Sequence, residues 1–180
     1  MRVILYFFIF FTIIFAENPN NMSLIELYNK KYYSFICMNR WKFIKMYIRK
    51  NEKILSLVAY SCLKKNYITP ALDLSKEMRF TKIGRNNGLY INELFMMKLL
   101  IIRYINDNYN LSTITLPEIK DNLLAKVFYL IKKQKPQVIN GTITLNENNN
   151  SYLVTYNKDT NEIIIKIFLN NILLKKVRYW

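Results

Sequence analysis

The chain has 180 residues, of which 27 are lysine or arginine and 12 are aspartate or glutamate, so its formal net charge is +15. Hydrophobic residues make up 52%, too many for a disordered tail, and charged residues make up 22%, too many for a multi-span membrane protein. The absence of histidine excludes His-dependent triads and His metal sites, and three glycines leave little room for a glycine-rich phosphate loop.

The positive charge has two explanations. Lysine, asparagine, isoleucine, tyrosine and phenylalanine are frequent and share AT-rich codons, so a genome-wide bias explains much of the charge without any function. A basic surface nevertheless attracts anionic lipid, nucleic acid or acidic proteins at low salt, over a distance of roughly 10 Å.

The first residues have the pattern of an export signal. Residues 1–2 carry a positive charge, residues 3–15 are apolar apart from Thr12, and a polar, turn-prone stretch follows. The apolar segment is shorter than the roughly 20 residues that span a bilayer as a helix. We therefore predict a signal peptide at residues 1–16 and a periplasmic mature chain that begins at Glu17. An uncleaved anchor is the alternative. Export argues against nucleic-acid partners and nucleotide cofactors, and it permits oxidised cysteines.

Helical periodicity extends from Ser23 to about Lys135. We predict a first helix from residue 23 to 49, with a break in its middle left open. One face of it carries Tyr33, Cys37, Trp41, Ile44 and Ile48. A second helix begins after Asn51, and a short third helix covers residues 70–78.

The later helices are more apolar. Residues 85–88 have the pattern of a turn or of a weak point within a helix, and residues 89–105 predict a central buried helix rather than a membrane span. The last helix is expected to open at residues 115–118 and to end before Pro136. A helical-repeat array of the tetratricopeptide or Sel1 type is an alternative, but no 34-residue period runs through this part.

After Pro136 the period changes to two. Alternation predicts strands at residues 141–145, 151–156, 162–169 and 172–180, separated by asparagine-rich turns. Short connections make these strands sequential neighbours. The fold class expected is α+β, with a signal peptide at 1–16, an irregular helical bundle at 17–135 and a small antiparallel β-meander at 136–180.

The two cysteines are predicted to form a disulfide. The midpoint between Cys37 and Cys62 lies at the turn expected around residues 50–51, and in an antiparallel helical hairpin residues equidistant from the turn lie level with each other. Two buried free thiols are the alternative. Neither cysteine has a histidine to activate it as a nucleophile.

Chemical sites are otherwise sparse. Glu93 is the single candidate for acid–base chemistry, because burial in an apolar helix raises the pKa of a carboxylate; an ion pair with a lysine or arginine is the expected alternative. We expect no catalytic, cofactor-binding or metal-binding residues and no enzymatic activity. Tyrosines interleave with lysines and could form a docking surface for another protein, or simply half-buried core: Tyr28, Tyr32, Tyr33, Tyr47, Tyr60 and Tyr67.

Residues 147–151 match the extended acceptor D/E-x-N-x-S/T of Campylobacter-type periplasmic N-glycosylation, with Asn149 as the acceptor. Asn21, Asn110 and Asn140 have only the shorter N-x-S/T pattern. The chain thus resembles a small periplasmic protein of that bacterial group. Its helical body with a small sheet is similar to the accessory periplasmic proteins of the polar flagellar motor, which form disks and scaffolds and have no catalytic residues.

These features favour a non-enzymatic periplasmic scaffold or adaptor that binds other proteins, with the flagellar motor disks as its most specific form. One alternative is an envelope-binding protein that recognises peptidoglycan or anionic lipid. Another is a secreted effector. The oligomeric state is left open.

Overall fold

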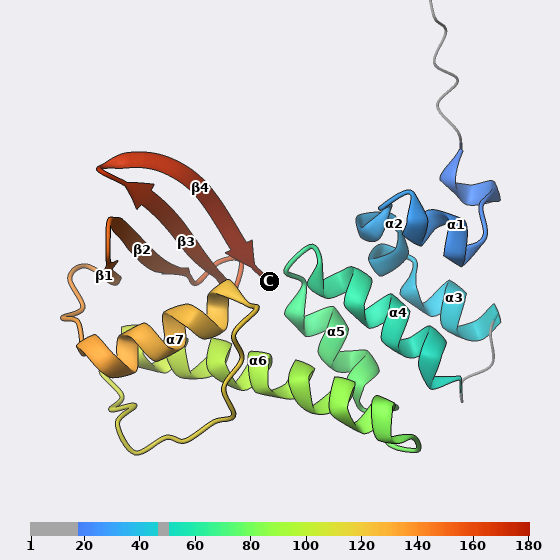
Figure 1. Ribbon diagram of the computed structural model, residues 1–180, viewed down its shortest axis with the longest axis horizontal. Coiled ribbons are helices and arrows are strands. Elements are labelled where there is room, and N and C mark those ends of the chain that lie inside the picture. The colour runs from blue at the N-terminus through green and yellow to red at the C-terminus, as the bar shows by residue number, and fades with distance from the viewer. Residues whose placement is uncertain (1–17, 47–50) are drawn as a thin grey trace, which may run out of the picture.

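The computed structural model describes residues 18–46 and 51–180 (Figure 1). The predicted signal peptide lies outside these residues. In chain order the described elements are η1 (Pro19–Asn21), α1 (Leu24–Asn29), α2 (Tyr33–Met38), α3 (Arg40–Met46), α4 (Glu52–Leu63), α5 (Ile68–Ser75), α6 (Lys82–Asp107), α7 (Leu123–Gln134), β1 (Thr142–Glu147), β2 (Asn150–Asn157), β3 (Glu162–Leu169) and β4 (Ile172–Tyr179). Helices followed by a four-stranded antiparallel sheet confirm the α+β class.

The expected first helix is divided into α1, α2 and α3. Ser23 and Glu26 form a capping box at the start of α1. The helix ends at Asn29, and Lys31, two residues later, has a positive φ of 62° in the left-handed region. A second interruption falls at Asn39, between α2 and α3. As a result Trp41 leaves the expected buried stripe and is 51% exposed.

A buried carboxylate fixes the start of α6. Glu52, in the first turn of α4, accepts hydrogen bonds from the backbone N–H groups of Phe80 and Thr81 and from the Thr81 hydroxyl. Thr81 in turn caps α6 by accepting from Gly84 N. A Cβ on Gly84 would lie 2.2 Å from Glu52 Oε2, so only glycine admits the carboxylate here.

Two expectations for the later helices are wrong. Of the two interpretations of residues 85–88, the turn is wrong, because these residues lie within α6, which is continuous from Lys82. The last helix begins at Leu123, capped by Asn122, and not at residues 115–118. The preceding segment is irregular, and its residues Leu111 and Ile119 are buried in the core.

The sheet is a meander in the order β1-β2-β3-β4, as predicted. Two-residue turns at Asn148–Asn149 and Asn170–Asn171 join its outer pairs of strands, and three of these four asparagines have positive φ. Alternate side chains on one face are buried, whereas the opposite face is covered by no helix; the buried residues are Ile143, Leu145, Tyr152, Val154, Ile163, Ile165, Val177 and Tyr179.

The buried residues form two clusters that meet along α6. One cluster joins α1–α5 to the first half of α6, and the other joins the second half of α6, α7 and the sheet. A second connection is made by Trp180, whose backbone N–H donates to Asn66 O and whose carbonyl accepts from Ile68 and Thr69. The chain end thereby ties β4 to the turn between α4 and α5 (Figure 1).

Candidate functional site

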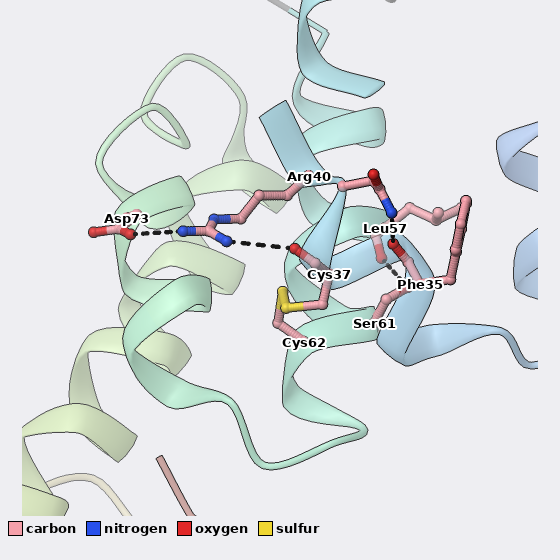
Figure 2. The surroundings of a disulfide bond; sticks show 8 residues. Phe35, Cys37, Arg40, Leu57, Ser61, Cys62 and Asp73 are labelled. Carbon is pink, nitrogen blue, oxygen red and sulfur yellow. Dashed lines mark hydrogen bonds and ion pairs between the residues drawn. A yellow bond between two sulfur atoms is a disulfide. The ribbon is translucent and has the colours of Figure 1, made fainter. Parts of the chain in front are cut away.

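The disulfide joins α2 to α4. Cys37 and Cys62 are bonded, with Cα atoms 4.9 Å apart, as the sequence predicted. Both side chains are buried between the two helices. Figure 2 shows the bond between α2 and α4, with Arg40 beside it reaching from the Cys37 carbonyl to Asp73 of α5. The relative position of α2 and α4 is therefore fixed covalently.

Arg40 extends this link to α5. Its guanidinium lies 3.6 Å from the carboxylate of Asp73 and donates to the carbonyl of Cys37 at 3.5 Å (Figure 2). The same guanidinium lies 5.4 Å from the centre of the Trp41 ring, which suits a cation–π contact. The end of α2 is thus held from two sides.

The helices that the disulfide joins carry an aromatic and basic surface. Tyr28 at the end of α1 contacts Tyr33 in α2 and Tyr60 in α4, with ring centroids 5.5 Å and 6.3 Å away. The ammonium of Lys64 lies 4.7 Å from the centre of the Tyr60 ring. We call these four residues the tyrosine–lysine surface. Tyr60 is 43% exposed, so the rings are accessible from solvent.

The electrostatics of the tyrosine–lysine surface favour a charged lysine beside neutral rings. A hydrogen bond with Tyr60, and its nearby phenolic oxygen, raise the pKa of Lys64. Partial burial, followed by the neighbouring rings of Tyr60 and Tyr33, raises the pKa of Tyr28. The surface combines three tyrosine rings with one cation, and tyrosine is enriched at the centres of protein–protein contacts.

The other tyrosines of the predicted docking surface lie elsewhere. Tyr32 is exposed beside Tyr33, but Tyr67 packs edge-on against Trp180 at a centroid distance of 6.1 Å and belongs to the link between helices and sheet. Tyr47 lies outside the described residues. The structure therefore brings together three of the six tyrosines.

Glu93 differs from expectation. It is half-buried in α6, and its Oε1 is buried without a hydrogen-bond partner in the described part of the chain. Burial raises the pKa of this carboxyl. Its electrostatic neighbour is Tyr129 in α7, not the expected lysine or arginine.

A second buried charge was not singled out from the sequence. Lys98 of α6 is 1% exposed, and Glu162, the first residue of β3, is equally buried. Burial lowers the pKa of Lys98, and the charge of Glu162 opposes this effect. Glu162 Oε1 accepts no hydrogen bond from the described residues. The sequence contains a signal for this buried lysine. Lys98 follows Leu94 by four residues and precedes Ile101 by three, so it shares a helix face with these two core residues.

Asn149 lies in the turn between β1 and β2. Its side chain is exposed, as a glycosylation acceptor requires, and its carbonyl accepts from Asn170 N at 3.4 Å. The β1–β2 and β3–β4 turns are therefore adjacent.

Over residues 18–46 and 51–180, no group of three or more Cys, Asp or Glu side chains is arranged to hold a metal ion. The helices within these ranges include none with the length and apolarity needed to cross a membrane. Comparison with protein-family models, with curated proteins and with solved structures finds no match. Function must therefore be inferred from the surfaces themselves.

Proposed function

We propose that the protein is an exported, non-enzymatic adaptor that binds an acidic partner protein through the tyrosine–lysine surface. The observation that carries this proposal is the meeting of three tyrosines from three helices near Lys64, two of which, α2 and α4, are joined by the disulfide. Large, stiff aromatic side chains lose little conformational entropy on binding, and a pre-ordered surface loses less than a mobile one.

The charge around the tyrosine–lysine surface points to an acidic partner. Lys30 and Lys31 occupy the connection from α1 to α2, and Lys64 and Lys65 follow α4. A basic rim speeds encounter with an acidic surface, while the aromatic centre contributes most of the affinity. A role as a disk or scaffold component of a polar flagellar motor is the most specific form of this proposal.

Site-specific photo-crosslinking in the native host tests the proposal. A photoreactive phenylalanine analogue at Tyr60 is expected to yield a discrete adduct with one acidic protein, and Lys64→Glu in the same chain is expected to abolish it. The matched control carries the analogue at Tyr109, a half-buried tyrosine in another part of the chain. Identical adducts from both positions, or an adduct that Lys64→Glu leaves unchanged, would contradict the proposal.

Salt separates this function from simple electrostatic adsorption. An aromatic-centred interface should persist when the salt concentration rises from about 0.1 M to 0.5 M, because the screening length falls but the apolar contact remains. If the yield of the adduct instead falls as the screening length falls, the contact depends on charge alone.

A further inference from the structure

The far end of the β3–β4 hairpin is apolar although no other element covers it. Ile172, Leu173 and Leu174 are 69%, 51% and 57% exposed, and they follow the turn at Asn170–Asn171 directly. Three consecutive large apolar side chains on an edge strand are a feature that soluble proteins normally avoid. Figure 1 places this turn at the outer end of the sheet, away from α1–α3.

The end of the hairpin is apolar on both of its faces. Phe168 pairs with Leu173, so these two side chains lie on one face, and Leu169 pairs with Ile172 on the other. A register shift between Ile167 and Phe168 leaves Leu174 unpaired. An end that is apolar all round suits a medium that surrounds it, such as the outer layer of a lipid bilayer.

Four cations lie immediately behind the apolar end. Lys166 pairs with Lys176 on one face, Lys175 lies on the other, and Arg178 follows along β4. None of these four cations has an ion-pair partner in the described part of the chain. At about 3.3 Å per residue, Lys175 and Lys176 lie about 10 to 13 Å behind Ile172.

The carboxylates near this end do not cancel that charge. Glu147 ends β1 at the same end of the sheet, but it is paired with Lys126 of α7. Glu162 begins β3 at the opposite end and is buried. The charged side chains of the hairpin beyond Glu162 are therefore all positive.

We propose that the β3–β4 hairpin is a membrane-docking element whose apolar end enters an anionic bilayer while its lysines contact the lipid phosphates. Interfacial segments bury their apolar part about 5 to 10 Å into the boundary between headgroups and acyl chains. The lysines lie about 10 to 13 Å behind Ile172, just beyond that depth, which places them at the level of the lipid phosphates. This inference uses residues distinct from the tyrosine–lysine surface, so either proposal can fail without the other.

Charge distinguishes a bilayer from a second copy of the chain. The outer edge of β4 makes no backbone hydrogen bonds to other described residues between Ile172 and Tyr179, so it could accept another strand. Two copies would, however, bring Lys175 and Lys176 of both chains together, and lysines on an edge strand oppose such pairing. An anionic surface is attracted by the same side chains.

Vesicle co-sedimentation tests the proposal with the processed protein recovered from cells that express the full chain. The probe is a vesicle of phosphatidylglycerol and phosphatidylethanolamine (1:3), compared with phosphatidylcholine. Lys175→Gln with Lys176→Gln is expected to weaken partitioning about 30-fold, because each cation near an anionic surface contributes about fivefold. Ile172→Ser with Leu174→Ser is expected to weaken it roughly tenfold or more.

Matched controls lie on other exposed surfaces. Leu89→Ser with Met96→Ser removes two exposed apolar side chains from α6, and Lys53→Gln with Lys82→Gln removes two exposed cations. Both control pairs are expected to partition like the unaltered protein. Equal loss in the controls, absence of a preference for anionic vesicles, or insensitivity to the serine pair would overturn the proposal.

A measurement of how deeply the hairpin inserts in the bilayer makes the test independent of whether any one variant folds. Leu173→Trp adds an indole at the apolar end, and lipids brominated along their acyl chains are expected to quench this added fluorescence in anionic vesicles only. No additional quenching relative to the unaltered protein would refute insertion. A dimer in sedimentation analysis that the serine pair dissolves, without vesicle binding, would assign the hairpin to self-association instead.

Discussion

Removal of the disulfide should cost a calculable amount of stability. The bond closes a segment with a sequence separation of 25 between Cys37 and Cys62. In the chain-entropy model a loop of this length stabilises the folded state by about 3.5 kcal/mol at 25 °C, because the linked unfolded chain has fewer conformations. For a chain of this size the corresponding fall in Tm is roughly 7 to 14 °C.

The prediction includes a pattern of non-additivity. Cys37→Ala and Cys62→Ala each remove the same single bond, so each single variant should lose nearly the whole amount. The double variant should lose little more than either one, apart from the packing lost at two buried side chains. Alanine is preferred to serine here, since serine would bury an unpaired hydroxyl.

Urea unfolding at 25 °C measures these differences, with the unaltered protein studied both oxidised and fully reduced. The oxidised protein should contain no free thiols after denaturation without reductant. Two free thiols per chain, or equal unfolding midpoints for the oxidised and reduced forms, would refute the reasoning. Losses that add up across the two single variants would show that packing, and not the covalent link, is responsible.

Four other predictions rest on separate features. Glu162→Gln removes the charge that opposes the lowering of the Lys98 pKa by burial, so it should lower the free energy of unfolding in the same urea assay. Replacing both residues, Lys98 by Met and Glu162 by Leu, should change the free energy of unfolding less than Glu162→Gln does. Hydrogen bonds, first of all from the Thr81 hydroxyl, lower the pKa of Glu52, so the stability it confers is present above its unfolded pKa of about 4.3 and is lost as the pH falls through its lower folded pKa. Glu52→Gln should therefore reduce stability at pH 6 and weaken its fall between pH 5 and pH 3, and an unchanged pH profile would contradict this. Asn149→Gln should increase gel mobility in a host that has the glycosylation system, and unchanged mobility would argue against a glycan. Intact-mass measurement of the native protein should give a chain that begins at Glu17, and a chain that begins at Met1 would exclude cleavage.

The sheet could be predicted closely because its signals are local. Alternation fixes which residues of a strand face the core, and asparagine pairs supply the positive φ of two-residue turns without help from distant residues. All four observed strands agree with the predicted ranges to within two residues, including the turn at Asn170–Asn171.

Helix ends depended on contacts that the local sequence does not contain. Residues 115–118 have a cap-like pattern, but Asn122 provides the cap instead, because Ile119 is buried and the Tyr129 hydroxyl donates to Pro117 O across the irregular segment. The disulfide was predicted through a continuous helical hairpin, and α2 is in fact a short separate helix. The pairing is correct because α2 still packs on α4.

The sequence predicted what kind of surface the candidate site is, but not which residues form it. Interleaved tyrosines and lysines indicated a docking surface, but which tyrosines meet depends on the angles between three short helices. Tyr28, Tyr33 and Tyr60 converge, whereas Tyr67 is taken up by Trp180. The sequence also did not show that the end of the hairpin is exposed, because an apolar strand has the same pattern whether its last residues are covered or exposed.

The separation of the two surfaces bears on what an adaptor of this shape can do. The tyrosine–lysine surface belongs to the cluster around α1–α5, and the hairpin extends from the cluster around α7 and the sheet (Figure 1). With 26 residues, α6 is about 39 Å long at 1.5 Å per residue and passes through both clusters. A single helix would leave a hinge between them, but the backbone hydrogen bonds of Trp180 to the turn after α4 form a second connection. Two connections hold the surfaces at a fixed separation, so a partner bound at Tyr60 would be kept at a defined distance from a bilayer that holds the hairpin.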